Sequence, residues 1–142
     1  MPIYLSFFAP IVTLVAACIG ATILWRIHMR NSLRSAATSF RAAFSDTMSQ
    51  LRNNHTTDVS AILETCFSAH ESAVLEFRVY LSKLESKSFM EAWHNYYCHD
   101  GNPSIPFLEQ YSKHLGSIEF AKTNRKRAIQ RIEHLLTYAK QT

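Results

Sequence analysis

Hydrophobic residues first gather in one uninterrupted run at the N-terminus. Residues 3–25 read IYLSFFAPIVTLVAACIGATILW, and the first 25 residues contain no Asp, Glu, Lys or Arg. As a helix rising about 1.5 Å per residue, this run is about 34 Å long, enough to cross a hydrocarbon core of about 30 Å. Tyr4 and Trp25 stand near its two ends, where amphipathic rings favour the membrane interface. The pattern predicts a transmembrane anchor over residues 1–26.

Beyond the anchor, apolar residues recur at intervals of three and four, the period of an amphipathic α-helix. The first such stripe consists of Leu33, Ala37, Phe40, Phe44, Met48 and Leu51. It ends at the polar cluster 53–57, after which Thr57 or Asp58 is expected to cap the next helix. The second stripe consists of Val59, Ile62, Leu63, Cys66, Phe67, Ala73, Val74, Phe77, Leu81 and Leu84. It predicts one helix of about 28 residues.

The C-terminal third predicts shorter helical segments. Ser88-Phe89-Met90-Glu91 has the spacing of a capping box at a helix start. The expected apolar face of that helix consists of Phe89, Trp93, Tyr96 and Tyr97. A turn-rich connection at 99–104 and a short helix from Pro106 to Tyr111 precede a last helix over 117–140. Its expected inward residues are Ala128, Ile129, Ile132, Leu135, Leu136 and Ala139.

These patterns together predict an all-α protein, with an N-terminal transmembrane helix followed by a cytoplasmic bundle of four to five helices over residues 27–142. The first stripe could also pair two chains in a parallel coiled coil. Phe40 and Phe44 are bulky for a narrow dimer seam, so we expect this stripe to pack inside a compact monomer.

Basic residues on one side of the apolar run set the expected orientation. Arg26, Arg30 and Arg34 follow the run closely, whereas no charged side chain precedes it. The positive-inside rule then places the N-terminus outside and the helical domain in the cytoplasm of a single-pass inner-membrane protein. In that reducing compartment, Cys66 and Cys98 are expected to be free thiols.

Two processing alternatives were weighed against a retained anchor. A cleavable signal peptide would carry Lys or Arg before a shorter apolar stretch, and neither feature is present. Val15-Ala16-Ala17-Cys18 resembles a bacterial lipobox, which would make Cys18 a lipidated N-terminus. Because residues 19–25 remain apolar where a lipoprotein would turn polar, we favour the anchor.

Charge is segregated along a chain whose formal net charge is +4. Residues 26–52 and 101–142 are basic, whereas residues 53–100 are acidic. The densest basic cluster consists of Lys122, Arg125, Lys126, Arg127 and Arg131. Part of this cluster (Lys122, Arg125, Lys126, Arg127), together with Arg26, Arg30 and Arg34, is a candidate contact for anionic lipid headgroups. A merely solvated helix face ranks first for the α4 cluster and lipid contact second, and nucleic acid ranks last because no recognised binding motif is present.

The densest set of potential metal ligands consists of His94, Cys98, His99 and Asp100. His94 and Cys98, four positions apart, would share a helix face. A structural zinc site normally has four ligands in paired motifs, and no second pair is present. We therefore favour a polar helix end and expect no metal or other cofactor.

His70 is the second candidate for chemistry because it lies on an apolar stripe beside Glu71, with Glu64 and Glu76 nearby in sequence. A histidine–carboxylate pair could transfer a proton, but we favour a core histidine that makes a structural hydrogen bond. No serine lies in G-x-S-x-G, and three scattered glycines cannot form a phosphate-binding loop. The sequence therefore favours association over catalysis.

Framework residues resemble those of a known family. They are Phe40-Arg41-Ala42-Ala43-Phe44, Phe67, His70, Ala73, Phe77-Arg78, Tyr80-Leu81, Phe89, Ala92-Trp93, Tyr96, Phe107, Tyr111 and the segment 131–140. The family comprises small, mainly proteobacterial, single-span proteins that often occur among integron gene cassettes. The resemblance implies a bacterial inner-membrane setting and a mobile-element context, and it carries no catalytic residues.

The function expected from these observations is that of a membrane-tethered helical interaction or regulatory module. Its expected partners are the lipid bilayer and an unidentified protein. The family context adds a role in bacterial defence or as an accessory of mobile elements, by association alone. The alternative is a membrane-bound hydrolase or metalloenzyme using His70, His94, Cys98 and His99.

Overall fold

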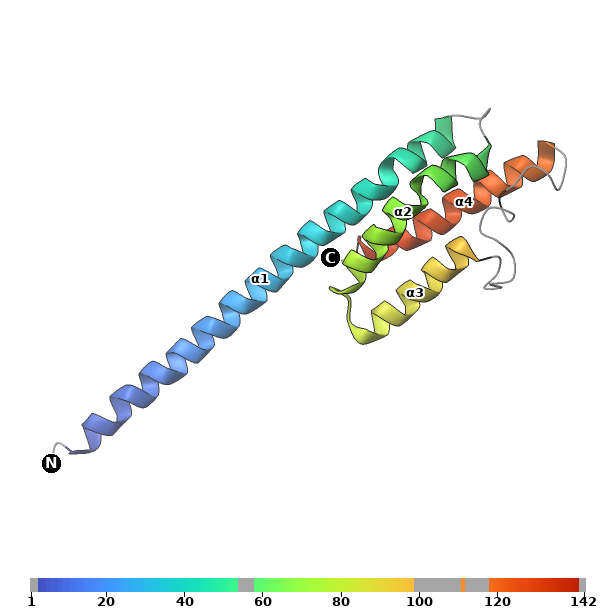
Figure 1. Cartoon of the computed structure of the whole chain (residues 1–142). Helices are drawn as coiled ribbons and strands as arrows, with labels where there is room; N and C mark the ends of the chain where they lie inside the picture. The colour runs from blue at the N-terminus through green and yellow to red at the C-terminus, as the bar shows by residue number, and fades with distance from the viewer. Residues whose placement is uncertain (1–2, 54–57, 99–110, 112–117, 141–142) are drawn as a thin grey trace. The chain divides into compact units, whose positions relative to one another are not determined.

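The computed structural model describes residues 3–53, 58–98, 111 and 118–140. Within these residues the chain forms four helices and no strand: α1 (Ile3–Asn53), α2 (Val59–Arg78), α3 (Lys83–Tyr97) and α4 (Ile118–Tyr138) (Figure 1). The expectation of an all-α fold is confirmed. The chain divides into two compact units, Met1–Arg34 and Ser35–Thr142.

In the second unit, α2 runs antiparallel to the last turns of α1. Phe40 of α1 stacks on Phe77, near the C-terminal end of α2, with 4.9 Å between ring centroids. Seven residues further along α1, Thr47 meets His70, which lies seven residues earlier in α2. α1 and α2 therefore run in opposite directions. Asp58 holds the N-cap position of α2 but makes no side-chain capping hydrogen bond.

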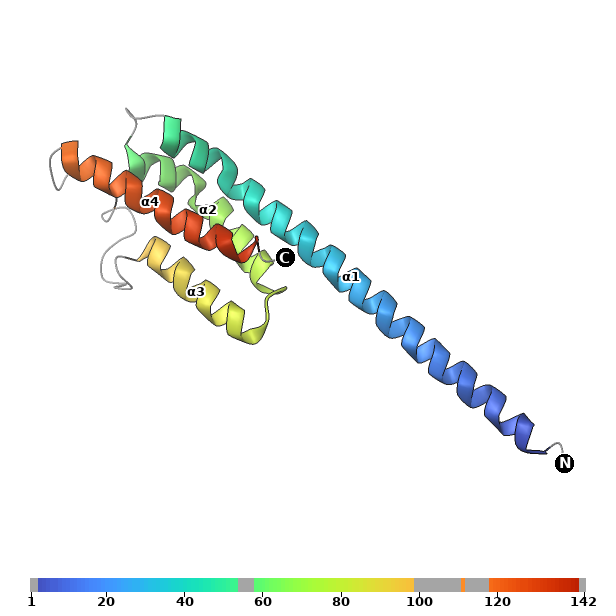
Figure 2. The same ribbon diagram turned by 180° about the vertical axis from the view of Figure 1, so that it is seen from behind.

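Helices α3 and α4 complete an up-down-up-down bundle (Figures 1 and 2). α3 runs back along α2, because Phe89 lies 5.6 Å from Phe77 and Trp93 stacks on Phe67 at 5.7 Å. α4 runs antiparallel to α3 (Figures 1 and 2), and Tyr138 at its end lies 5.3 Å from Phe89 of α3. Antiparallel neighbours of this kind bury one apolar stripe from each helix in a common core.

The apolar stripe of α1 packs inside the bundle of its own chain. Ala37, Phe40, Phe44, Met48 and Leu51 are all buried, whereas Leu33 is half-buried. Phe40 alone contacts three rings, those of Phe44, Phe77 and Phe89. Aromatic pairs at such distances add about 0.5–1.5 kcal/mol each beyond area burial. The expectation that the stripe belongs to a globular core is confirmed.

The prediction of one long helix from Val59 to about Leu84 is wrong. α2 ends at Arg78, and α3 begins after Ser82, six residues before the capping box expected at Ser88. The Ser82 hydroxyl accepts from the Glu85 amide at 3.3 Å, and the Glu85 carboxylate accepts from the Ser82 amide at 3.1 Å. Both tetrapeptides have the S-x-x-E spacing, and only the earlier one lets α3 fold back along α2.

The new boundary changes which apolar side chains lie inside. Leu84 is exposed and Leu81 is half-buried, so the prediction that Leu84 faces the core is wrong. On α3, the buried positions are Phe89, Ala92, Trp93 and Tyr96, and Tyr97 is half-buried. On α4, Ala128, Ile132, Leu135 and Ala139 are buried, whereas Ile129 and Leu136 are half-buried.

The expected turn at 99–104 and most of the expected short helix at 106–111 lie outside the described residues. Tyr111 is described and is buried in the bundle. Its hydroxyl donates to the Tyr96 carbonyl at 2.8 Å, near the C-terminal end of α3. Tyr111 therefore joins the segment before α4 to the core.

Candidate functional site

The first candidate site is the apolar segment of α1, the run of residues 3–25. From Val12 to Trp25 its large apolar side chains are between 51% and 68% exposed, and no residue of this stretch is buried. Among the described residues, α1 is the one helix long and apolar enough to cross a membrane. A helix that is apolar all round and has no protein surface against it requires another apolar environment.

The three arginines predicted to follow the membrane boundary are all exposed on α1. Arg26, Arg30 and Arg34 succeed one another at intervals of four residues, so they lie on adjacent turns of nearly one helix face. Such a row can place three guanidinium groups at the level of lipid phosphates.

The structure separates the basic residues of α4 into two kinds. Lys122 and Lys126 are exposed, whereas Arg125, Arg127 and Arg131 are half-buried. Arg125 donates to the Leu51 carbonyl at 2.9 Å, and burial lowers the pKa of its guanidinium while the charge of Asp58 raises it. Arg125 therefore satisfies a carbonyl in the last turn of α1, a structural task that sequence reasoning did not anticipate.

Arg131 also has a structural partner, because its guanidinium donates to the Tyr111 hydroxyl at 3.3 Å. Burial raises the pKa of Tyr111, and the nearby Arg131 charge opposes that shift. Lys122 and Lys126 are therefore the exposed cations of the cluster, and Arg127 lies half-buried beside them. An anion contact by Lys122, Arg125, Lys126 and Arg127 stays a prediction.

His70 is the centre of a buried polar network inside the bundle. Its Nε2 lies 3.0 Å from Thr47 Oγ1 of α1, and its Nδ1 lies 3.0 Å from the Tyr96 hydroxyl of α3. The imidazole ring also stacks on Phe44, with 4.0 Å between centroids. All four residues are inaccessible to solvent. The network thus joins three helices through one histidine.

Burial dominates the electrostatics of this network. The pKa of His70 is lowered to about 4, mainly by desolvation, while the Ala43 carbonyl opposes that shift by favouring the protonated ring. Desolvation also raises the pKa of Tyr96. The histidine is therefore neutral at physiological pH, with one ring nitrogen donating and the other accepting.

The expectation that His70 is a core histidine is confirmed. Its side-chain partners are the neutral hydroxyls of Thr47 and Tyr96, whereas Glu64, Glu71 and Glu76 are all exposed. The alternative that His70 pairs with a neighbouring carboxylate is therefore wrong, because both ring nitrogens lie beside hydroxyl groups. Sequence reasoning missed Thr47 and Tyr96 because they lie 23 and 26 residues away.

The candidate metal ligands are only partly described. His94 Nδ1 lies 2.9 Å from the Tyr97 hydroxyl, and Cys98 is buried with its amide bonded to the His94 carbonyl at 2.7 Å. His99 and Asp100 lie outside the described residues. Within the described parts, no three His, Cys, Asp or Glu residues gather around a common point.

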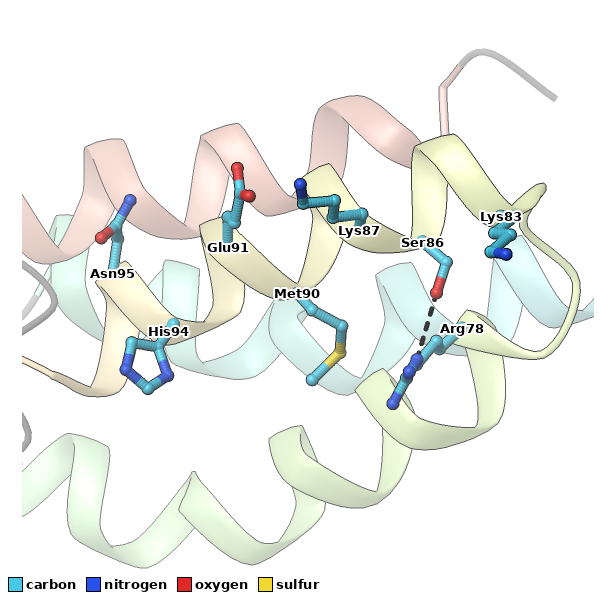
Figure 3. A pocket seen from close by; sticks show the side chains of 8 residues that line it. All are labelled: Arg78, Lys83, Ser86, Lys87, Met90, Glu91, His94 and Asn95. Atoms are coloured by element: carbon cyan, nitrogen blue, oxygen red, sulfur yellow. Dashed lines mark hydrogen bonds between the residues drawn. The ribbon is translucent and has the colours of Figure 1, made fainter.

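An open groove of about 790 Å³ runs along α3 beside the end of α2 (Figure 3). Arg78 Nε donates to Ser86 Oγ at 3.1 Å across its rim, while Met90 and His94 point from α3 toward α2. The full lining consists of Arg78, Lys83, Ser86, Lys87, Met90, Glu91, His94 and Asn95. Sequence reasoning missed this groove because it expected one helix from Val59 to Leu84, across the turn that separates α2 from α3.

Comparison with known proteins adds no relative from which a function could be transferred. No protein-family model, no curated protein and no solved structure matches this chain.

Proposed function

We propose that the protein is a single-span bacterial inner-membrane protein whose cytoplasmic helical bundle acts by association, as an interaction or regulatory module. One observation carries this proposal: no residue of the apolar segment is buried from Val12 to Trp25, whereas the apolar stripe of the same helix from Ala37 to Leu51 is buried. Each large aliphatic side chain gains about 1.5–3 kcal/mol on leaving water. A bilayer supplies that gain for the apolar segment.

Arg26, Arg30 and Arg34 support a cytoplasmic bundle. They are exposed, and each basic residue near an anionic leaflet contributes about 1 kcal/mol. They would bind lipid phosphates immediately after the span and hold its register. A role in defence or as a mobile-element accessory follows only from the family resemblance.

Action by association rather than catalysis is supported by the state of His70. This histidine is neutral, fully buried and saturated by two hydroxyls, so it is no accessible base.

Membrane insertion and orientation are tested with charged substitutions in the span. Ile19→Lys combined with Ile23→Lys places two charges in the apolar segment, at a cost of about 2.5–3.5 kcal/mol each. We expect the variant to leave the membrane pellet after alkaline extraction, whereas Ala61→Lys, at an exposed position of α2, stays membrane-bound. A soluble wild-type protein would overturn the anchor.

A reporter fused after Thr142 is expected to be active only as a cytoplasmic reporter. Periplasmic activity would reverse the orientation, and a fatty-acylated mature protein beginning at Cys18 would establish the lipoprotein alternative.

The metalloenzyme alternative is tested by elemental analysis of the purified protein. We expect no stoichiometric zinc or iron. A full equivalent of metal that is lost in His94→Ala and Cys98→Ser would favour the enzyme instead.

A further inference from the structure

The exposed large apolar side chains that the structure describes in the bundle lie between Leu75 and Leu84, around the end of α2 and the start of α3. Among the described residues from Ser35 onward they are Leu75, Val79, Tyr80 and Leu84. Val79 is 79% exposed and Leu84 is 77% exposed, more than any of the large apolar side chains from Val12 to Trp25. We call Val79, Tyr80 and Leu84 the turn patch. Clustering of this kind, in contrast to scattered surface apolar residues, marks an interaction site.

The turn that carries the patch is a well-ordered reversal. Val79 continues α2 with helical backbone angles, and the amides of Tyr80 and Leu81 donate to the carbonyls of Phe77 and Arg78. The capping box of Ser82 then begins α3. These hydrogen bonds hold the patch on the outside, so its exposure is built into the fold.

Charged side chains surround the turn patch. Arg78, Lys83 and Lys87 are exposed, and Figure 3 shows all three on the two helix ends that meet at the turn. Glu76 and Glu85 are also exposed, and the Ser82 hydroxyl and amide donate to the Glu85 carboxylate and lower its pKa, so that it stays negatively charged. The rim therefore holds three cations and two carboxylates, and an apolar tip with a net positive rim suits an interfacial contact with an anionic leaflet.

The position of the turn in the bundle agrees with a lipid surface. It lies at the end where Phe40 meets Phe77 and Phe89, which is the end at which the chain enters the bundle at Ser35. The α4 contact of Arg125 with Leu51 lies toward the opposite end. Because the bundle is joined to the anchor at Ser35, its effective concentration at the bilayer is high. A modest affinity of the turn for lipid is therefore enough to keep it bound.

We propose that the α2–α3 turn is a second membrane contact. Val79, Tyr80 and Leu84 enter the interface of an anionic leaflet, while Arg78, Lys83 and Lys87 bind the lipid phosphates. This inference rests on the proposed anchor. It adds that the bundle itself contacts the bilayer, at a second site besides the anchor. Truncating the apolar side chains of the turn patch should weaken the affinity of the turn for the bilayer at least about tenfold, because each side chain contributes a large fraction of its transfer free energy from water.

The test uses the full chain in lipid nanodiscs, with a nitroxide label at Val79→Cys. The background carries Cys18→Ser and Cys66→Ser, and the buried Cys98 is retained. In discs of phosphatidylcholine with phosphatidylglycerol, we expect collisions with a water-soluble nickel complex to be at least about fivefold rarer than for the exposed control Ala61→Cys, because the label sits below the headgroups. Equal collision rates at the two sites would overturn the proposal.

Two further variants separate the causes of shielding. A label at Tyr80→Cys should collide with the nickel complex more often when Val79→Ser and Leu84→Ser are added. The far-UV circular dichroism should stay unchanged, because both residues are exposed. Arg78→Gln, Lys83→Gln and Lys87→Gln together should reduce protection in the anionic discs toward the level in pure phosphatidylcholine. Protection unaffected by both sets would contradict a lipid contact.

A label on native Cys18 in the Cys66→Ser background reports the anchor separately. If Cys18 is lipid-exposed and Val79 is not, the turn contact is wrong and the anchor stands. If Cys18 itself is water-exposed, the anchor fails. A short distance between Val79 labels in discs holding two chains would show that a second copy covers the patch, and would overturn the lipid assignment.

Discussion

His70 should make the bundle unstable to mild acid. Its pKa is about 4 in the folded chain and about 6.5 when the chain is unfolded, so the unfolded state binds the proton more strongly. The free energy of unfolding is therefore highest above about pH 7 and falls as the pH drops through 6.5 toward 4. At about 1.4 kcal/mol per unit of pKa difference, the full loss is about 3 kcal/mol.

The structure gives the reason for this magnitude. The imidazole is fully buried, stacks on Phe44 at 4.0 Å and contacts two neutral hydroxyls, so no carboxylate is among its side-chain partners. Protonation would place an uncompensated charge in the aromatic core. A loss of about 3 kcal/mol is a large share of the roughly 5–15 kcal/mol that holds a domain together.

The assay is urea unfolding of the full chain in detergent between pH 4.5 and 7.5. Trp93 is buried in the bundle, and in a Trp25→Phe background it is the reporter of bundle unfolding. His70→Gln keeps a donor and an acceptor but does not titrate, so its stability should vary far less with pH. His134→Gln, at an exposed position, should keep the wild-type slope. A wild-type slope in His70→Gln would refute the assignment.

Three further predictions concern the fold. Phe44→Asp should unfold the bundle, because a buried carboxylate in place of a fully buried ring costs about 5 kcal/mol or more; a folded, merely less associated variant would contradict this. Ser82→Ala should lower the free energy of unfolding by about 1 kcal/mol in the same urea assay, whereas Ser88→Ala should change it by less than about 0.5 kcal/mol. Asn124 is fully buried with neither amide atom hydrogen-bonded in the described part of the chain, so Asn124→Leu should raise the free energy of unfolding by about 1–2 kcal/mol, and a loss of stability would reveal a partner for the amide.

The sequence by itself determined the elements that depend on local periodicity. The charge-free run of residues 3–25 is apolar throughout, the stripe from Ala37 to Leu51 recurs every three or four residues, and both lie in α1 as expected. The helical class and the inward face of α4 were also predictable, because a stripe spaced by three and four residues fits no other regular structure.

Local pattern alone could not decide where α2 stops. Ser82 and Ser88 each begin an S-x-x-E tetrapeptide, and no glycine or proline separates them. The choice depends on the reversal that brings Phe89 against Phe77 and Phe40, a gain that exists only once three helices are assembled. The same reversal leaves Val79 and Leu84 outside, so the turn patch is a tertiary feature.

The partners of His70 were likewise decided by the tertiary structure. In sequence the histidine stands beside Glu71, but on a helix adjacent residues point in different directions, and Glu71 is exposed. Thr47 and Tyr96 reach the ring only because antiparallel packing aligns α1, α2 and α3 at that level. Periodicity determined that His70 lies inside, and the packing of distant helices determined that its neighbours are hydroxyls, which keep it neutral.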